Sequence, residues 1–410
     1  MHIIFYNAFT ALLSLGIRIA SIWNKKAGLW VKGRKKFPKF DSTSPCVWMH
    51  SASLGEFEQG RPVIEYIRKQ YPAYRIVVTF FSPSGYEIKK NYSGADAVYY
   101  LPADTAENAK KFIRAINPAL VIWIKYDYWY HYLTTLHSMQ IPVLLVSAIF
   151  RESQPFFKWY GTLWRKMLSS FSHLFVQNEH SLHLVQELVK QNVSVNGDTR
   201  FDRVRDIAKE FKDIDAIKEF CGDSRVIVAG STWEEDEAQL VHFINSRRQI
   251  KFIIAPHEIT QTHLTDLQKK CKDSILFSQL DPSDEMTAQV LIIDNIGMLS
   301  RLYRYGSIAY VGGGFNSSGI HNILEAAVYG IPVVFGPVYA KFEEAKALVE
   351  VLGAFSFSNA PELEKILHEL LEDEAYRLKA GAVAGNYVTG NGGATQRILD
   401  YIAANRLLTN

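Results

Sequence analysis

Short apolar runs alternate along this chain with amphipathic segments of helical period. The first series consists of CVWMH, RIVVTFF, AVYYLP, ALVIWI, PVLLVSA and HLFVQ. A second series consists of RVIVAGS, KFIIAPH, SILFS, VLIID, IAYVGGG and IPVVFGP. Buried strands that alternate with helices form parallel α/β sheets. The pattern therefore predicts two α/β halves, each Rossmann-like.

A turn-rich and then charged stretch separates the two series and predicts the domain boundary. It reads NVSVNGDTRFDRVRDIAKEFKDIDAIKEFCGDS, and we place the boundary within residues 203–222. We expect a first domain over 25–205, a second over 206–386 and a terminal helix over 387–410 that packs back on the first domain. Open α/β sheets bind ligands at the carboxyl ends of their strands, so two such domains facing each other would form a cleft.

The N-terminal segment combines an apolar stretch with a basic flank. Residues 3–23 are apolar apart from small polar residues and Arg18, and residues 25–39 hold seven Lys or Arg and no acid. This order predicts a membrane anchor over residues 1–24 with the body on the cytoplasmic side. A cleaved signal peptide would carry its charges before the apolar run. A spanning helix, an interfacial helix and a buried N-terminal helix all remain open.

Composition narrows the classes of protein. The chain has 410 residues, is 48% apolar and 21% charged, and carries a net charge of +3. These values fit a folded body, and the charge is too small to indicate a nucleic-acid partner. The three cysteines are odd in number and form no CxxC pair, which argues against a disulfide framework or a zinc site. His180 and His183 lack a third ligand at suitable spacing, so we predict no metal site.

The strongest motif in the second half is VGGGFNSSGIHNILEAAVYGIPVVFGP. A strand ends in three glycines, and a helix is predicted from near His321 to Gly330. Glycines allow close approach of a backbone to a ligand, and a helix start favours phosphate. A dinucleotide fingerprint would need glycine where Ser317 stands, which argues against a nicotinamide enzyme. Glu325 lies where a carboxylate reaches ribose hydroxyls, and this arrangement favours a nucleotide-sugar transferase over a dehydrogenase.

Glu56 in HSASLGEFEQGRPVIEYIR has two interpretations. Small residues followed by an acid are typical of a helix N-terminus, where the acid complements the helix dipole. The alternative is that Ser51, Ala52, Ser53 and Gly55 leave room for a bulky ligand above a functional carboxylate. Local sequence favours the capping role, because acids are common in first turns.

Several motifs together resemble one known family. SASLGE, QNEHS with NGDTRFD, AGSTWEEDE, APHE and the long glycine motif occur in the order and spacing of the 3-deoxy-D-manno-octulosonic acid (Kdo) transferases. The resemblance implies a GT-B fold and inverting transfer of Kdo from CMP-Kdo to a lipid A precursor, lipid IVA, in lipopolysaccharide biosynthesis. It also implies a location at the cytoplasmic face of the inner membrane, and CMP-Kdo as donor substrate without a separate cofactor. The alternative is a GT-B transferase or epimerase that acts on another nucleotide sugar.

The resemblance also assigns roles to individual residues. It implies that Glu56 is the general base and that Asp127 and Arg200 stabilise the transition state. The implied CMP site comprises Pro256, His257, Ile296, Gly297, Met298, Asn322, Ile323, Leu324 and Glu325.

This sequence departs from the family pattern at several of these motifs, and the family commonly has lysine where Arg200 stands. Lys125 and Asp127 stand where the family commonly has two glutamates. Pro256 and His257 follow each other directly, whereas the family commonly has an arginine between them. Met298 stands where the family has glutamate, so a nucleotide contact at that position must come from the backbone.

Overall fold

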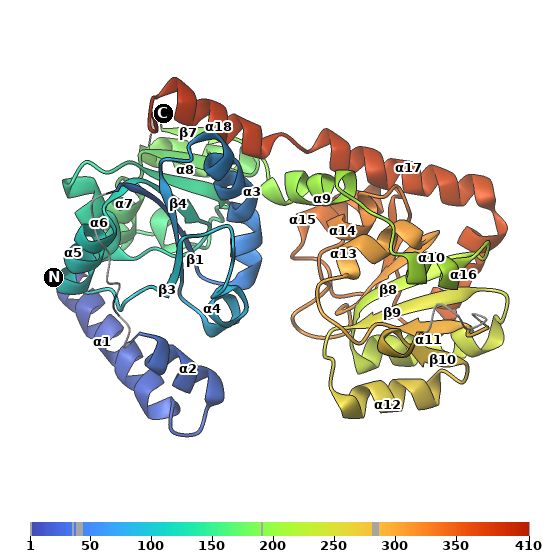
Figure 1. Ribbon diagram of the computed structural model, residues 1–410. Helices are drawn as coiled ribbons and strands as arrows, with labels where there is room; N and C mark the ends of the chain where they lie inside the picture. Colours follow the sequence, from blue (N-terminus) through green and yellow to red (C-terminus); the bar gives the residue numbers. More distant parts are fainter. Residues whose placement is uncertain (1, 35–36, 38–43, 190–191, 281–286, 410) are drawn as a thin grey trace. The chain divides into compact units, whose positions relative to one another are not determined.

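The computed structural model describes residues 2–34, 37, 44–189, 192–280 and 287–409 (Figure 1). The chain divides into two compact units. The first unit comprises Met1–Arg203 together with Gly392–Asn410, and the second comprises Val204–Asn391. The chain passes into the second unit after Arg203 and returns to the first unit after Asn391, so the last helix belongs to the first unit.

The first unit is a parallel sheet with the strand order β3-β2-β1-β4-β5-β6-β7. The strands are β1 (Cys46–Ser51), β2 (Arg75–Phe80), β3 (Ala97–Tyr100), β4 (Pro118–Ile124), β5 (Val143–Ala148), β6 (His173–Val176) and β7 (Val193–Val195). The helices between them are α3 (Leu54–Gln70), α4 (Pro83–Lys89), α5 (Ala106–Ile116), α6 (Tyr130–Ser138), η1 (Pro155–Phe157), α7 (Thr162–Leu168) and α8 (Glu179–Val189). The direction of winding reverses between β1 and β4, which makes their carboxyl ends the topological switch point.

The second unit is also a parallel sheet, with the order β10-β11-β9-β8-β12-β13-β14. Its strands are β8 (Val226–Thr232), β9 (Lys251–Pro256), β10 (Ser274–Leu276), β11 (Val290–Ile292), β12 (Ile308–Val311), β13 (Val333–Phe335) and β14 (Ala354–Ser356). Its helices are α10 (Asp215–Cys221), α11 (Glu234–Ser246), α12 (Gln261–Lys270), η2 (Phe277–Gln279), α13 (Leu299–Leu302), η3 (Tyr303–Tyr305), α14 (Leu324–Ala327), α15 (Glu343–Glu350), α16 (Ala360–Glu372) and α17 (Glu374–Gly390). Helix α9 (Thr199–Lys209) begins in the first unit and ends in the second. In this unit the switch point lies between β8 and β12.

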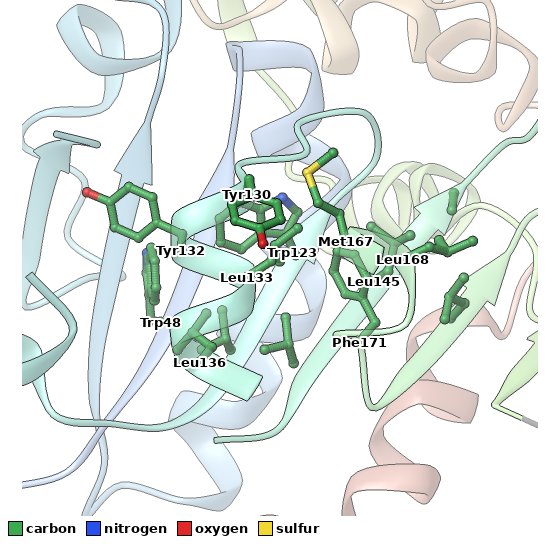
Figure 2. Close-up of a cluster of buried hydrophobic side chains, with 14 of the residues drawn as sticks. Trp48, Trp123, Tyr130, Tyr132, Leu133, Leu136, Leu145, Met167, Leu168 and Phe171 are labelled. Atoms are coloured by element: carbon green, nitrogen blue, oxygen red, sulfur yellow. The ribbon is translucent and has the colours of Figure 1, made fainter. Parts of the chain in front are cut away.

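The core of the first unit follows from the period of two along its strands. Trp48 of β1 and Trp123 of β4 point to one face, where their ring centroids lie 5.5 Å apart in an edge-on arrangement. Tyr132 and Leu133 of α6 complete this cluster (Figure 2). Val47 and its alternating neighbours point to the opposite face and pack beneath α3. Both faces are therefore covered, as parallel sheets require.

The terminal helix, α18 (Ala394–Ala404), packs on the first unit beside α3. The carboxylate of Asp202 accepts hydrogen bonds from the backbone N–H groups of Gly393 (2.5 Å) and Thr395 (2.6 Å). The single helix expected over residues 387–410 is wrong in its start. Helix α17 runs on to Gly390, and the chain then turns through Gly393, whose φ of +92° breaks the helix before α18 begins.

The apolar N-terminal segment forms α1 (His2–Ala20), which is followed by α2 (Lys25–Gly33). Its stretch Ile3–Ala20 is long and apolar enough to span a membrane by length and composition, and only 11% of that stretch is buried. Phe5 and Leu12 are each more than two-thirds exposed. Part of the predicted basic flank, including Lys35, Lys36 and Lys39, lies outside the described residues.

The other face of α1 is tied to the first unit by polar contacts. The Tyr6 hydroxyl donates to the buried carboxylate of Asp104 (2.5 Å) and accepts from the backbone N–H of Tyr130 (3.1 Å). The Asn7 side chain lies 2.7 Å from the His131 ring nitrogen. A segment that completes a buried hydrogen-bond network is part of the domain as well as an apolar surface.

We predict that Tyr6→Phe lowers the free energy of unfolding by about 1–3 kcal/mol, because it leaves a buried carboxylate without one of its donors. Urea titration followed by tryptophan fluorescence measures the effect. Tyr66→Phe is the matched control, since Tyr66 is 42% exposed. Equal stability of the two variants would show that the α1 contact contributes nothing to folding.

Candidate functional site

Glu56 lies at the switch point of the first unit, in the first turn of α3 and directly after β1. Ser53 is the N-cap residue of that helix, and its own side chain makes no capping hydrogen bond. Instead the Glu56 carboxylate accepts from the backbone N–H of Ala52 (2.5 Å) and of Ser53. This is the return half of a capping box, so the capping role read from the sequence is present in the structure.

Asp127 lies in the turn after β4, on the other side of the same switch point. Its carboxylate is 3.2 Å from Nε2 of His50 and accepts from the indole N–H of Trp129 at 3.3 Å. The His50 ring is buried at the end of β1, and its Nδ1 lies 2.9 Å from the hydroxyl of Thr79. The indole N–H of Trp123 donates to the Asp127 carbonyl. These contacts fix both the backbone and the carboxylate of Asp127.

Glu56 has the electrostatic environment of a general base. Burial raises its pKa, the nearby Asp127 carboxylate raises it further, and the resulting pKa is about 7. The Ala52 and Ser53 amides and the Lys125 ammonium oppose this shift. A carboxylate that titrates near neutral pH can accept a proton and release it again under cellular conditions. The side chain that caps α3 therefore also has a pKa suited to a general base.

Arg200 is oriented by Asp198. The Asp198 carboxylate accepts from the backbone N–H of Arg200 (2.9 Å), from its Nε (2.8 Å), and from the Gln59 amide. Burial alone would raise the pKa of Asp198, but the charges of Arg200 and Lys125 outweigh it and hold that pKa below its usual value. A buried carboxylate that stays ionised fixes the guanidinium in one position.

The structure links the three residues Glu56, Asp127 and Arg200 into one cluster. Lys125 connects them, because the positive charge of its ammonium lowers the pKa of both Glu56 and Asp198. Its backbone has φ of +54°, an uncommon conformation for a non-glycine residue that is typical of functional turns. Sequence reasoning treated Lys125 only as a departure and missed Asp198 and His50. Asp198 stands in the NGDTRFD motif, which was the available signal.

Three stacked rings lie at the switch point of the second unit. Trp233 follows β8, His257 follows β9, and His321 follows the glycine loop after β12. The His257 ring stacks on both others, with centroid distances of 4.5 Å to each, and the Trp233 indole N–H donates to Nε2 of His321 (3.2 Å). Burial lowers the pKa of His257, and it lowers that of His321 to about 4. Both histidines are therefore neutral at pH 7 and do not replace the arginine missing beside Pro256.

The packing of the protein itself accounts for the three glycines after β12. A Cβ at Gly312 would lie 2.2 Å from the Ser231 carbonyl oxygen, and one at Gly314 would lie 2.6 Å from the Gly336 backbone. Gly313 has φ of +91°, and its N–H donates to Asp236 at 2.8 Å. Asp236 also accepts from the Trp233 N–H (2.9 Å), which caps the start of α11. Ligand approach is not needed to explain these glycines.

The helix expected from His321 to Gly330 is wrong in length. Helix α14 spans only Leu324–Ala327, which is a single turn. One turn sums few peptide dipoles, so the argument for a phosphate at its start loses its basis. Asn322 closes the turn, with its amide donating to Glu325 (3.1 Å) and its oxygen accepting from the Leu324 N–H (3.3 Å).

The remaining predicted nucleotide residues occupy the same edge of the second sheet with unequal access. The Ile323 and Leu324 side chains are buried in the core, so only their backbone can meet a ligand. Residues 296–298 follow β11 in a loop where Ile296 is 92% exposed and Gly297 has φ of +98°. Pro256 ends β9, which pairs with both β8 and β11. Parallel strands end at one edge, and this brings the three segments to that edge.

Comparison with known proteins shows which family this chain resembles. The family model for 3-deoxy-D-manno-octulosonic-acid transferase matches residues 23–203. The Kdo transferase of Aquifex aeolicus is 29% identical over 348 residues, covering 82% of this chain and 90% of that protein. That of Haemophilus influenzae is 26% identical over 372 residues, covering 87% and 86%. The chain is a homologue of the Kdo transferases.

Solved structures show the fold of this Kdo transferase homologue. A UDP-GlcNAc 2-epimerase from Neisseria meningitidis superposes with a TM-score of 0.62 at 16% identity, over 87% of this chain and 99% of the other. MurG of Acinetobacter baumannii gives 0.55 at 12% identity, over 88% and 100%. These likenesses confirm the GT-B fold class with two Rossmann-like domains. At such low identity they carry no information about the substrate.

Proposed function

We propose that this protein is an inverting glycosyltransferase that moves Kdo from CMP-Kdo to lipid IVA in lipopolysaccharide biosynthesis. The relatives that carry the Kdo transferase name over most of their length support the reaction class. The observation that carries the proposal is Glu56, a carboxylate with a pKa of about 7 held beside Asp127 at the switch point of the first unit.

In the proposed reaction the acceptor sugar hydroxyl attacks the anomeric carbon of Kdo. Glu56 takes the hydroxyl proton as the new glycosidic bond forms, and the bond to CMP breaks with its electron pair leaving on the phosphate. A single displacement of this kind inverts the anomeric centre. Arg200, oriented by Asp198, shares the negative charge of the leaving phosphate or of the donor carboxylate. Asp127 stabilises positive charge that develops on the sugar.

The CMP part of the donor is assigned to the carboxyl edge of the second sheet. Asn322 and Glu325 are hydrogen-bonded to each other there, and Glu325 is proposed to accept from ribose hydroxyls. His257 and His321 are neutral at pH 7, so the phosphate contact on this side is assigned to backbone N–H groups.

We further propose that α1 holds the enzyme at the cytoplasmic face of the inner membrane. The support is its exposed apolar side and the basic residues that follow it. The contacts of Tyr6 with Asp104 and Tyr130 favour an interfacial helix, because a helix fixed to the domain along one side presents only its other side to lipid.

The rival is a GT-B enzyme that acts on another nucleotide sugar, a class that includes the epimerases of similar fold. Incubation with CMP-Kdo and tetraacylated lipid A precursor, followed by mass spectrometry, should show a product heavier by Kdo. A parallel incubation with UDP-GlcNAc should leave that sugar unchanged. Reaction of UDP-GlcNAc without transfer of Kdo would favour the rival.

We predict that Glu56→Gln lowers kcat by about 10²- to 10⁴-fold while CMP affinity stays unchanged, because glutamine keeps the capping contacts but cannot take the proton. Kinetics with CMP-Kdo and calorimetry with CMP measure the two quantities on the same preparation. If Glu56 serves only as a cap, the variant should instead turn over at a nearly normal rate.

The pH profile provides a separate prediction. Only ionised Glu56 accepts a proton, so kcat/KM should fall as pH drops below about 7, the pKa of this group. Asp127→Asn removes a negative charge that raises this pKa, so the profile should move to lower pH. Lys125→Met removes a positive charge that lowers it, so the profile should move to higher pH. Profiles that coincide for all three proteins would assign the titration to another group.

We predict that Glu325→Ala weakens CMP binding about 10- to 200-fold, which corresponds to about 1.5–3 kcal/mol for a hydrogen bond to a charged group. Calorimetric titration with CMP measures it. Glu350→Ala is the control, since that exposed residue at the end of α15 also loses a carboxylate in the second unit. Equal affinity of the two variants would place the ribose elsewhere.

A further inference from the structure

An apolar groove of about 540 Å³ lies in the first unit between α1 and α7. Phe5 and Phe9 of α1 form one wall, and Leu163, Trp164 and Met167 of α7 form another. Trp129, from the turn after β4, also lines the groove. The volume falls in the range of about 300–1,000 Å³ that is usual for ligand pockets.

The groove is lined by residues of the apolar helix α1 and by a residue that contacts the candidate site. Phe5 is 69% and Phe9 60% exposed, on the apolar face of α1. Trp129, which also lines the groove, donates its indole N–H to the carboxylate of Asp127 at 3.3 Å. A ligand in the groove would therefore contact both the apolar helix and a residue that is hydrogen-bonded to the candidate site.

The wall at Trp129 is held in place. Its ring stacks on Phe81 with centroids 4.9 Å apart and planes 29° apart, and Phe81 contacts Trp30 of α2. The guanidinium of Arg34 covers Trp30 at 3.7 Å and donates to the Phe81 carbonyl at 2.8 Å. Groups fixed before a ligand arrives lose little conformational entropy on binding, so this wall of the groove is preorganised.

We propose that this groove binds one acyl chain of the glycolipid acceptor. The inference rests on the proposed function and adds how the acceptor is held. The lining is largely apolar and carries hydroxyls only on Tyr6, Tyr128 and Tyr160, so a sugar or nucleotide would leave most of its polar groups without partners, whereas an acyl chain gains from burial there. The Tyr6 hydroxyl, which α1 contributes to the groove, is already bonded to Asp104. A chain anchored beside Trp129 places the sugar it carries near Asp127 and Glu56.

The test compares a variant whose groove is filled by a new side chain with a variant whose groove is unchanged, and it assays both with two acceptors. Leu163→Trp places a large ring in the groove, and Leu12→Trp adds the same ring on the exposed face of α1, at a residue that does not line the groove. The acceptors are tetraacylated lipid A precursor in mixed detergent micelles and the same phosphorylated disaccharide with its acyl chains removed. The CMP affinity and the thermal midpoint of each variant show whether it is folded. If Leu163→Trp does not fold, Leu163→Phe replaces it.

We expect the wild-type protein and Leu12→Trp to lose at least tenfold in kcat/KM when the acyl chains are removed. Leu163→Trp should already be impaired at least tenfold on the acylated acceptor and lose little more on the deacylated one. Equal kcat/KM of Leu163→Trp and Leu12→Trp on the acylated acceptor would overturn the groove proposal. So would a Leu163→Trp variant whose kcat/KM is lower than that of the wild type by the same factor on both acceptors. A wild-type protein that transfers Kdo to neither acceptor would instead refute the proposed function itself.

Discussion

The parallel pairing of β1 with β4 is the constraint on which the candidate site depends. In this register His50 lies opposite Trp123. One strand then sends His50 to the Asp127 carboxylate, while the other sends the Trp123 indole to the Asp127 carbonyl. The turn after β1 enters α3 at the same edge, so Glu56 comes close enough for Asp127 to raise its pKa. A shift of one residue in this register would turn these side chains to opposite faces of the sheet.

The second unit uses the same topology with different chemistry. Its switch point between β8 and β12 is crowded by backbone, and Asp236 ties the glycine loop to the start of α11. Burial lowers the pKa of His257 and His321, whereas at the switch point of the first unit the charges of Lys125 and Arg200 hold Asp198 ionised. The proposed proton transfer is assigned to that first unit.

The N-terminal helix contributes to both structure and surface. Its polar side completes the hydrogen bonds of Asp104, and its apolar side remains exposed. These two roles occupy opposite faces because a helix repeats every 3.6 residues. The apolar groove lies along the boundary between those faces. The proposed attachment to a bilayer and the proposed binding of an acylated acceptor can therefore share one element.

The sequence by itself determined the features that depend on neighbouring residues. The alternation of short apolar runs with amphipathic helical segments predicted two Rossmann-like halves, and the order and spacing of short motifs pointed to the Kdo transferase family. The cap at Glu56 was also readable, because its donors, Ala52 and Ser53, lie within one helical turn. These features are local, so a window of a few residues contains their causes.

Only the tertiary structure decided the features that depend on residues far apart in the chain. The pKa of Glu56 depends on burial and on Asp127, and the docking of α1 depends on Tyr6 meeting Asp104, 98 positions away. The glycines after β12 are required by Ser231 and Gly336, and the helix expected at His321 proved to be one turn. Desolvation, Coulomb interactions and close packing act through space, and sequence spacing does not report which distant residues will meet.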